Sequence, residues 1–172
     1  FLSGYFGRDV FAFQDIFGTD WGNATGTLRW VHLMSPKLFL NSTLIFSNFS
    51  NKISVGDDTG NFDLTSGITD FQLKEDFQYY WNTKNTVKFG VDIIHHTFSP
   101  GDLETSFDNI NITLEKKYAL ESGMYISNEQ TVNDYIKLKY GLRYSNFAVM
   151  GPGTTYTYND NHERIDSVVY TD

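Results

Sequence analysis

The stretch from Tyr135 to Phe147, YIKLKYGLRYSNF, decides the fold. Its even positions are apolar or aromatic, whereas its odd positions are mostly basic, small or polar. The even set is Ile136, Leu138, Tyr140, Leu142 and Tyr144, and the odd set includes Lys137, Lys139, Gly141, Arg143 and Ser145. Because successive side chains of a strand point to opposite faces of a sheet, this period of two predicts a β-strand with one wholly apolar face.

The same alternation recurs upstream and predicts three antiparallel hairpins. One charge, Glu75, stands in an otherwise apolar row and has no explanation from the sequence. From Leu38 to Ile53 the alternation is weak, because Leu38, Leu40, Leu44 and Phe46 lie on one side but Phe39, Ile45 and Phe49 on the other, so its register is uncertain. The predicted hairpins pair Trp21–Leu33 with Leu38–Ile53 through Ser35–Lys37, Phe71–Tyr79 with Val87–Ile93 through Asn82–Asn85, and Tyr118–Glu129 with Tyr135–Phe147 through Thr131–Asp134, after an opening strand over Phe1–Phe13.

Connections between the hairpins are richer in Gly, Asp and Asn than the turns within them. We expect longer loops over Phe17–Asp20, Val55–Asn61, Pro100–Asn111 and Gly151–Arg164. Short turns alternating with longer loops are typical of bacterial outer-membrane barrels, in which the turns are periplasmic and the loops extracellular. The strands are also long, at about ten residues or more, where soluble sheets usually have five or six.

Composition narrows the class further. The 172 residues are 40% hydrophobic and 17% aromatic, but the aromatic side chains are scattered singly among polar neighbours. The mean hydropathy is -0.35, and the sequence lacks the run of about 20 apolar residues that a spanning helix needs. A net charge of -8 without a basic cluster makes nucleic acid an unexpected partner. With no cysteine, a disulfide scaffold is excluded.

A sheet with one apolar face must cover that face, and the sequence offers no amphipathic helix for the purpose. Lipid is the remaining cover, and strands span a bilayer only in closed barrels. We therefore predict an all-β fold: an antiparallel transmembrane β-barrel segment of about seven strands. A soluble β-sandwich or lipocalin-like barrel with the apolar face inside is the alternative. Aromatic residues near strand ends are candidates for interfacial girdles, namely Trp21, Trp30, Tyr79, Tyr80, Trp81, Tyr135 and Tyr144.

Four stretches carry a resemblance to a known family. They are Trp21–Asn48 (WGNATGTLRWVHLMSPKLFLNSTLIFSN), Ser66–Asp92 (SGITDFQLKEDFQYYWNTKNTVKFGVD), His95–Glu104 (HHTFSPGDLE) and Leu114–Gly153 (LEKKYALESGMYISNEQTVNDYIKLKYGLRYSNFAVMGPG). These stretches resemble the barrel region of TonB-dependent receptors from Bacteroidetes-type bacteria. The resemblance implies a 22-stranded outer-membrane barrel with an N-terminal plug, which imports a scarce nutrient when TonB pulls on the plug.

On this resemblance, residues 1–172 are an internal part of one barrel domain, without the plug, signal peptide, TonB-contacting segment or terminal strand. The expected partners are outer-membrane lipid, TonB through the missing N-terminal region, and a surface lipoprotein lid of the kind paired with some family members. The transported ligand stays open between a small molecule such as a siderophore, a peptide and an oligosaccharide. Two other hypotheses remain: a receptor-like barrel that is a structural or assembly component of an envelope complex, and a soluble β-barrel binding module.

We expect no enzyme and predict no catalytic, cofactor-binding or metal residue, because neither a phosphate loop nor a nucleophile elbow is present. His95 and His96 are adjacent on a strand and so point to opposite faces, while His32 and His162 stand alone. An oxygen-rich segment is a weak calcium candidate, and ordinary loop chemistry is the favoured interpretation. It comprises Asp57, Asp58, Thr59, Gly60, Asn61 and Asp63, and a similar cluster comprises Asn159, Asp160, Asn161 and Glu163.

Two further sets of residues have an ordinary interpretation. Asn-x-Ser/Thr triplets at Asn23, Asn41, Asn48 and Asn111 are interpreted as chance. The charges predicted to face the enclosed space are expected to form a network with each other, with water or with a plug, in preference to a substrate site. They are Arg29, Lys74, Asp76, Lys88, Asp92, Lys137, Lys139 and Arg143.

Overall fold

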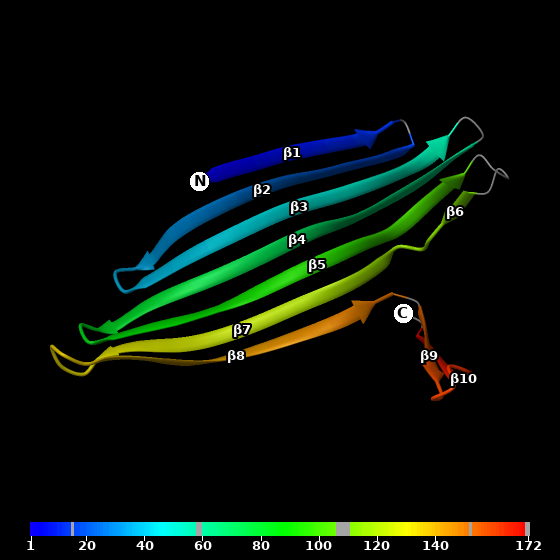
Figure 1. Cartoon of the computed structure of the whole chain (residues 1–172). Coiled ribbons are helices and arrows are strands. Elements are labelled where there is room, and N and C mark those ends of the chain that lie inside the picture. The colour runs from blue at the N-terminus through cyan, green and yellow to red at the C-terminus, as the bar shows by residue number, and fades with distance from the viewer. Residues whose placement is uncertain (15, 58–59, 106–110, 152, 171–172) are drawn as a thin grey trace.

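The computed structural model describes residues 1–14, 16–57, 60–105, 111–151 and 153–170 of the chain and consists of β-strands joined by turns (Figure 1). This confirms the all-β prediction. Among the described residues, no helix is long and apolar enough to cross a membrane. The strands are β1 (Leu2–Phe13), β2 (Phe17–Ser35), β3 (Leu38–Asp57), β4 (Gly60–Asn82), β5 (Asn85–Thr105), β6 (Asn111–Thr113), β7 (Lys117–Thr131), β8 (Lys137–Met150), β9 (Gly153–Tyr158) and β10 (Arg164–Tyr170).

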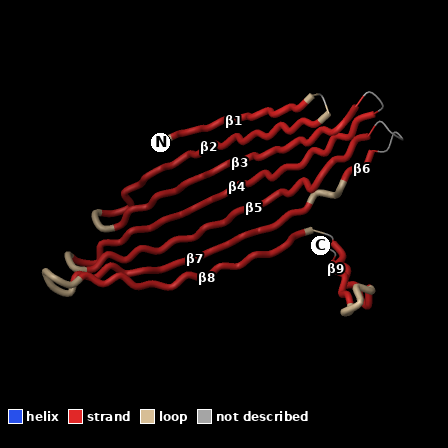
Figure 2. The backbone as a smooth tube through the Cα atoms, viewed as in Figure 1, coloured by secondary structure: helices blue, strands red, loops and turns tan. Residues whose placement is uncertain are grey.

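Eight of these strands form one antiparallel sheet in the order β1-β2-β3-β4-β5-β7-β8, with the short β6 paired to β5 beyond the end of β7. Each long strand thus pairs with its neighbour along the chain. The sheet is open in the described residues, with β1 and β8 as its two edges, so the barrel closure implied by the sequence is not seen (Figure 2). Strands β9 and β10 form a separate two-stranded hairpin that turns away after β8.

The three predicted hairpins are confirmed, and their turns lie together at one end of the sheet (Figure 1). At the β7–β8 turn, Asn133 Oδ1 accepts hydrogen bonds from the backbone N–H groups of Tyr135 and Ile136, at 3.0 and 2.9 Å. Asparagine stabilises turns in this way, by replacing a missing backbone partner. We call this end the turn end, and the opposite end, where β1 meets β2 and β3 meets β4, the loop end.

The long loops expected at the loop end are mostly strand, which corrects that part of the prediction. Phe17–Asp20 belongs to β2, Pro100–Thr105 belongs to β5, and the segment Gly151–Arg164 contains most of a hairpin. Within Val55–Asn61, residues 55–57 end β3 and residues 60–61 begin β4. Gly, Asp and Asn are poor strand formers, but a neighbouring strand that offers a continuous hydrogen-bond ladder overrides that local preference.

The sheet has no dry core in the part of the chain that is described. Only Thr43, Gly90, Gly101 and Ala119 are buried there. Large apolar side chains are instead widely exposed, among them Leu142 at 79%, Phe71 at 58% and Met124 at 57%. A single layer of strands in water leaves its apolar side chains wet, so this sheet needs a cover that lies outside its own secondary structure.

Candidate functional site

Cross-strand pairing assigns every strand residue to one of two faces, because residues directly opposite each other in an antiparallel ladder lie on the same face. We call the face that carries Leu142 face A and the face that carries Arg143 face B. Leu142 pairs with Ile126, which pairs with Phe89, and this row continues through Phe77 and Leu40 across the sheet on face A.

The half of face A nearer the turn end forms an apolar belt. On β4 the belt runs from Phe71 to Tyr79. We name it the belt; its members include Leu28, Trp30, Leu40, Leu44, Phe46, Phe71, Leu73, Phe77, Val87, Phe89, Val91, Ile93, Leu120, Met124, Ile126, Leu142 and Tyr144.

Glu75 is the one Asp, Glu, Lys or Arg among the described residues of the belt. Its carboxylate accepts a 2.6 Å hydrogen bond from the hydroxyl of Ser42, the residue directly opposite on β3. The pair is only partly buried. This hydrogen bond supplies the explanation that the sequence lacked: two polar residues from neighbouring strands meet within an apolar row and satisfy each other.

Face B at the turn end carries charged side chains that interact in two separate groups, and Val31, Leu33 and Phe39 of β2 and β3 add apolar residues to this face. Asp76 accepts a 2.6 Å hydrogen bond from the Tyr125 hydroxyl and lies 3.3 Å from Lys74. Glu129 lies 2.8 Å from Lys88 and 3.4 Å from Lys139. The sequence prediction that these charges share one face and interact is confirmed for this group. Arg29, Asp92, Lys137 and Arg143 lie on the same face.

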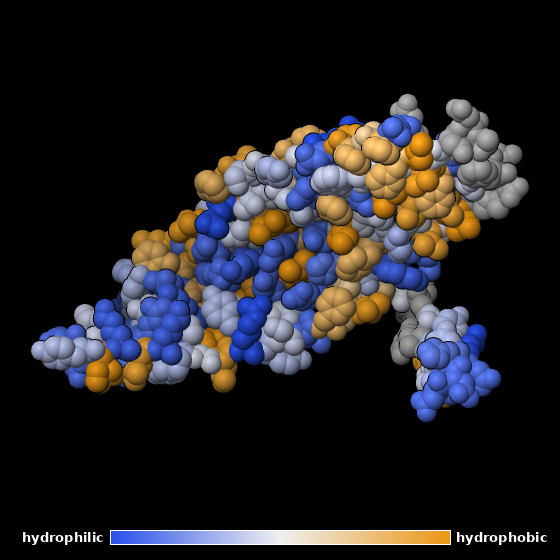
Figure 3. Space-filling view, viewed as in Figure 1, coloured by the Kyte–Doolittle hydropathy of each residue, from blue (hydrophilic) through white to orange (hydrophobic). Residues whose placement is uncertain are grey.

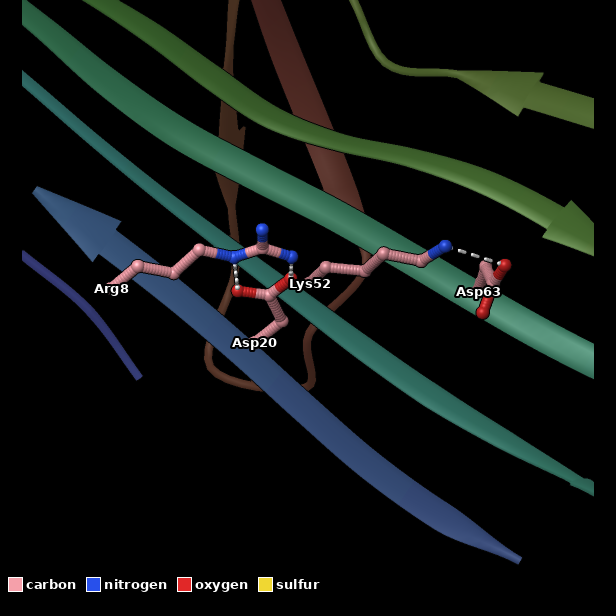
Figure 4. A network of polar contacts seen from close by, with 4 residues as sticks. All are labelled: Arg8, Asp20, Lys52 and Asp63. Atoms are coloured by element: carbon pink, nitrogen blue, oxygen red, sulfur yellow. Dashed lines mark hydrogen bonds and ion pairs between the residues drawn. The ribbon is translucent and has the colours of Figure 1, made fainter. Parts of the chain in front are cut away.

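At the loop end the two faces exchange character. Face A carries an ion ladder there across β1 to β4, made of Arg8, Asp20, Lys52 and Asp63 (Figure 4), and on β1 the exposed apolar residues Phe6 and Val10 flank Arg8 on the same face. The Arg8 guanidinium donates two hydrogen bonds to the Asp20 carboxylate, one of them 2.9 Å from Nε. Lys52 Nζ lies 2.9 Å from Asp63 Oδ2. Charges thus alternate in sign from one strand to the next, which favours the observed register.

The ladder shifts the titration of its members. The hydrogen bond from Arg8 lowers the pKa of the Asp20 carboxyl, and hydrogen bonds from Ser54 and then Lys52 lower the pKa of Asp63. The same contacts raise the pKa of Arg8 and of Lys52. All four groups are therefore charged at neutral pH. The side chains of Arg8 and Lys52 are 60% and 45% exposed. Ion pairs this exposed contribute little to the free energy of folding, so the ladder mainly identifies a surface that is compatible with water.

Face B at the loop end becomes apolar and aromatic. Phe13 pairs with Phe17, and the rings of Phe11 and Phe17 lie 6.5 Å apart between centroids. Figure 3 shows hydrophobic residues gathered near the loop ends of the first strands, next to a hydrophilic region over the middle of the sheet. We name this surface the aromatic wall; it consists of Phe11, Phe13, Phe17, Trp21, Phe49, Ile53, Val55, Phe62, Leu64, Ile68 and Phe98.

The aromatic wall is exposed, and charged residues border it. Phe13, Phe49 and Trp21 are 57%, 41% and 39% exposed. Its polar members include hydroxyls and amides such as Thr19, Asn51 and Ser66, and two charged residues lie directly opposite wall residues: Asp9 opposite Trp21, and Lys117 opposite Phe98. Sequence reasoning missed this surface. A partial signal was present in β3, where apolar residues occupy both even and odd positions up to Phe46 but only odd positions from Phe49 to Val55.

The histidines lie where the strand pattern predicted. His95 is on face A and His96 on face B, so the two do not converge on one metal. His96 Nδ1 lies 2.8 Å from Asp70, and its Nε2 lies 3.8 Å from Glu121. His32 is exposed on face A beside Trp30, and His162 lies in the β9–β10 turn. Among the described residues, no three His, Cys, Asp or Glu side chains group as a metal site would require.

The two oxygen-rich segments have different outcomes. Asp58 and Thr59 lie outside the described residues, so the calcium candidate is not tested there, while Asp63 pairs with Lys52. In the second segment, Asn159 Oδ1 accepts backbone hydrogen bonds from Asn161 and Glu163, and its amide donates to the Glu163 carboxylate at 2.9 Å. These oxygens and amides cap the β9–β10 turn, as the ordinary loop interpretation predicted.

The expected girdle residues divide between the faces. Tyr79 lies on face A at the turn end, and Trp81 lines a groove there with Val87 and Leu142, which fits a girdle. Trp30 and Tyr144 lie within the belt instead, and Tyr135 is in the β7–β8 turn, 96% exposed. Trp21 and Tyr80 are on face B, so they do not join these residues. The triplet asparagines Asn23, Asn41, Asn48 and Asn111 all lie in strands.

Comparison with known proteins gives no relative: no family model, no curated protein and no solved structure matches the chain.

Proposed function

We propose that the chain forms part of the wall of a transporter barrel in the outer membrane of a Gram-negative bacterium, of the TonB-dependent receptor type. The observation that carries the proposal is the belt. It is an apolar surface across the six strands β2, β3, β4, β5, β7 and β8, it contains one carboxylate among the described residues, and no described element covers it. The hydrocarbon of a lipid bilayer would cover such a surface, because the free-energy cost of placing polar side chains in hydrocarbon is high.

The height of the belt supports this proposal. From position 71 to position 79 a strand advances about 26 Å, at roughly 3.3 Å per residue. Strands of outer-membrane barrels tilt by about 45°, which reduces that rise to about 20 Å along the membrane normal. The apolar band of such barrels is about 25 Å tall. The strands of 19 to 23 residues in β2 to β5 then extend well beyond the membrane at their loop ends.

The open edges also fit a part of a larger wall. In hydrocarbon every backbone N–H and C=O needs a partner, so β1 and β8 would each pair with a further strand. A closed barrel supplies both partners, and the polar network on face B would then face an enclosed aqueous space. Three further parts of the proposal rest on the family resemblance: TonB-driven import of a nutrient, a plug in the lumen and a lipoprotein lid. An envelope scaffold would need the same wall without a plug.

Two neighbouring residues on opposite faces test the proposal. The chain has no cysteine, so Leu142→Cys and Arg143→Cys each introduce a unique thiol within it. The full-length protein, with any cysteine elsewhere replaced, is labelled with a polarity-sensitive dye in lipid vesicles that contain spin-labelled acyl chains. We expect blue-shifted, strongly quenched emission at position 142 and neither effect at position 143.

Equal quenching at both positions, or none at either, would contradict a membrane wall and would favour the soluble module. Transport is tested separately by sequencing the parent reading frame and by uptake into cells. A plug sequence upstream of this chain, together with growth on a nutrient that stops when TonB is deleted, supports a transporter. A membrane wall without a plug supports the scaffold.

A further inference from the structure

A groove lies at the turn end, between the β4–β5 turn and the β7–β8 hairpin. These two turns are side by side (Figure 1), and the backbone N–H of Thr131 donates a 2.7 Å hydrogen bond to the carbonyl oxygen of Lys84. This bond continues the β5–β7 ladder by one residue. Lys137 is directly opposite Thr131 on β8. Lys84, Thr131 and Lys137 therefore form one row across the sheet on face B.

The groove is small and its lining is rich in basic and hydroxyl side chains. Its volume is about 270 Å³. We name it the lysine groove; its lining includes Lys84, Lys137, Lys139, Thr86, Thr131 and Glu129. Pockets for drug-sized ligands usually have about 300 to 1,000 Å³, so this groove suits one compact chemical group.

Basic side chains outnumber carboxylates around the lysine groove. On face B of the β5, β7 and β8 ladders, the four rows from Thr131 to Tyr125 contain five basic side chains and one carboxylate among the described residues. The basic ones are Lys84, Lys88, Lys137, Lys139 and Arg143, and the carboxylate is Glu129. The whole chain has a net charge of -8, so this patch opposes the overall charge. Like charges this close repel each other, and a bound anion would relieve the repulsion.

Two of the lysines have no ionic partner in the described part of the chain. Lys84 and Lys137 are exposed, and no described carboxylate lies within 4.0 Å of either ammonium group. Glu129 is shared, because it lies 2.8 Å from Lys88 and 3.4 Å from Lys139. One carboxylate does not neutralise two lysines, so the groove presents positive charge that the protein does not balance.

The residue types in the groove favour phosphate over carboxylate. A lysine ammonium is a compact charge with three donors that commonly binds phosphate, whereas the planar fork of arginine matches a carboxylate. The groove has lysines and threonine hydroxyls, and no arginine among the described residues that line it. A phosphate group carries up to two charges and three strong acceptor oxygens, which several lysines and a hydroxyl can contact together.

We propose that the lysine groove binds a phosphate group through the ammonium groups of Lys84, Lys137 and Lys139, with the Thr131 hydroxyl as a further donor. The phosphate belongs either to a soluble ligand or to a phospholipid headgroup, since both offer the same chemistry. This inference goes beyond the proposed function and does not depend on it, because charge and geometry at the turn end carry it without a membrane.

Binding is measured by calorimetry on the full-length protein in uncharged detergent at physiological salt, which screens weak surface attraction. The probes are inorganic pyrophosphate, short-chain phosphatidylglycerol below its micelle concentration, and an oligoglutamate. We expect at least one phosphate probe to bind, and the tighter one identifies the source. The oligoglutamate should bind about tenfold more weakly than that probe. Failure of both phosphate probes would overturn the inference. Preference for the oligoglutamate would also overturn it and would indicate an acidic protein segment.

A double lysine variant tests the location of the site. Lys84→Gln with Lys137→Gln should weaken binding of the phosphate probe about tenfold, since each exposed ion pair contributes modestly. Lys37→Gln is the matched control, because Lys37 is also an exposed lysine in a turn at this end but lies outside the groove. It should leave binding unchanged. Equal losses from the double variant and the control would indicate general attraction to a basic surface and would contradict a site.

Glu129 gives a test of opposite sign. Glu129→Gln removes the one carboxylate of the groove and releases Lys139 from it, so phosphate binding should strengthen about threefold. Weaker binding, with an unchanged circular dichroism spectrum, would contradict the proposed arrangement. The thiol test at positions 142 and 143 is independent of these measurements. Quenching as expected without phosphate binding leaves the membrane proposal alone, and phosphate binding without quenching leaves the lysine groove alone.

Discussion

The two halves of this sheet use the same strands but opposite faces. In the turn half, face A is apolar and face B carries charged networks; in the loop half, face A carries the ion ladder and face B the aromatic wall. No irregularity interrupts the β3–β4 ladder between the halves. On β3 and β4 the apolar side chains therefore change face because of the order of residues in the sequence, and not because a bulge rotates the strand.

On β3 the exchange occurs over a short polar segment. Leu44 and Phe46 lie on face A with Ile45 between them on face B. Ser47 and Asn48 follow, and from Phe49 to Val55 the apolar residues lie on face B alone. On β4 the same change separates Ile68 on face B from Phe71 on face A. A strand that reversed its apolar side at random would not be matched by its neighbours, so a boundary shared by several strands indicates a common change of surroundings.

The strongest test of this comparison places one charge on each side of the boundary. Leu44→Arg and Ser50→Arg are both on face A of β3, six residues apart. In lipid vesicles, Leu44→Arg should lower the free energy of unfolding by about 2 to 4 kcal/mol, as for arginine near the middle of a barrel's apolar band. Ser50→Arg should change it by less than about 1 kcal/mol, since that residue would lie in water.

Urea titration of the full-length protein in vesicles, followed by tryptophan fluorescence, gives both values. Comparable losses from the two variants would mean that the boundary between the halves does not correspond to a membrane surface. The belt and the ion ladder would then be two patches of one aqueous face.

A smaller effect is expected at the exception within the belt. Glu75 is held by a 2.6 Å hydrogen bond from Ser42, yet it is surrounded on face A by apolar rows. Replacement of a carboxylate by an apolar side chain in hydrocarbon removes a desolvation penalty, so Glu75→Leu should stabilise the protein in vesicles by about 1 to 2 kcal/mol. Glu75→Gln keeps an acceptor for Ser42 and serves as the control. Its free energy of unfolding should lie between those of the wild type and Glu75→Leu.

The measurement is again urea unfolding, repeated in vesicles and in detergent. Strong destabilisation by Glu75→Leu, with full retention of stability in Glu75→Gln, would show that the carboxylate position makes a necessary hydrogen bond. The residue would then not be a tolerated exception in the belt.

Much of the turn half could be predicted from the sequence, because its strands alternate cleanly. In β8, the alternation of apolar and polar residues predicts that Leu142 and Arg143 lie on opposite faces. The Asn-containing turns predict where the hairpins reverse. His95 and His96 were assigned to opposite faces by the same argument. Local periodicity is enough to assign side chains to faces where one face stays apolar and the other polar along the whole strand.

The loop half could not be predicted in this way. The alternation of β3 looks weak because Phe39 and Ile45 lie on face B within its turn half, and because the apolar residues from Phe49 onward lie on face B, opposite to Leu44 and Phe46. The Gly, Asp and Asn residues of this half suggest loops by their local preference, whereas pairing between neighbours makes strands of Val55–Asp57 and Pro100–Thr105. Pairing is not visible in one strand's sequence, so the aromatic wall emerges only when register is known.

The smallest expected effect concerns the ion ladder, and it is confined to the loop half. Because the pKa values of Asp20 and Asp63 are lowered from 3.8 in the folded chain, their ionised forms favour folding at neutral pH. That contribution is present above the ordinary pKa and is lost as the pH falls below it toward the lowered values. The protection of backbone amides from hydrogen exchange, measured against the intrinsic exchange rate at each pH, should therefore fall with acid more in the loop halves of β1 to β4 than in their turn halves. Asp20→Asn with Asp63→Asn should remove this difference, since neither amide titrates, and an equal acid response in both halves of the wild-type sheet would place the pH sensitivity outside the ladder.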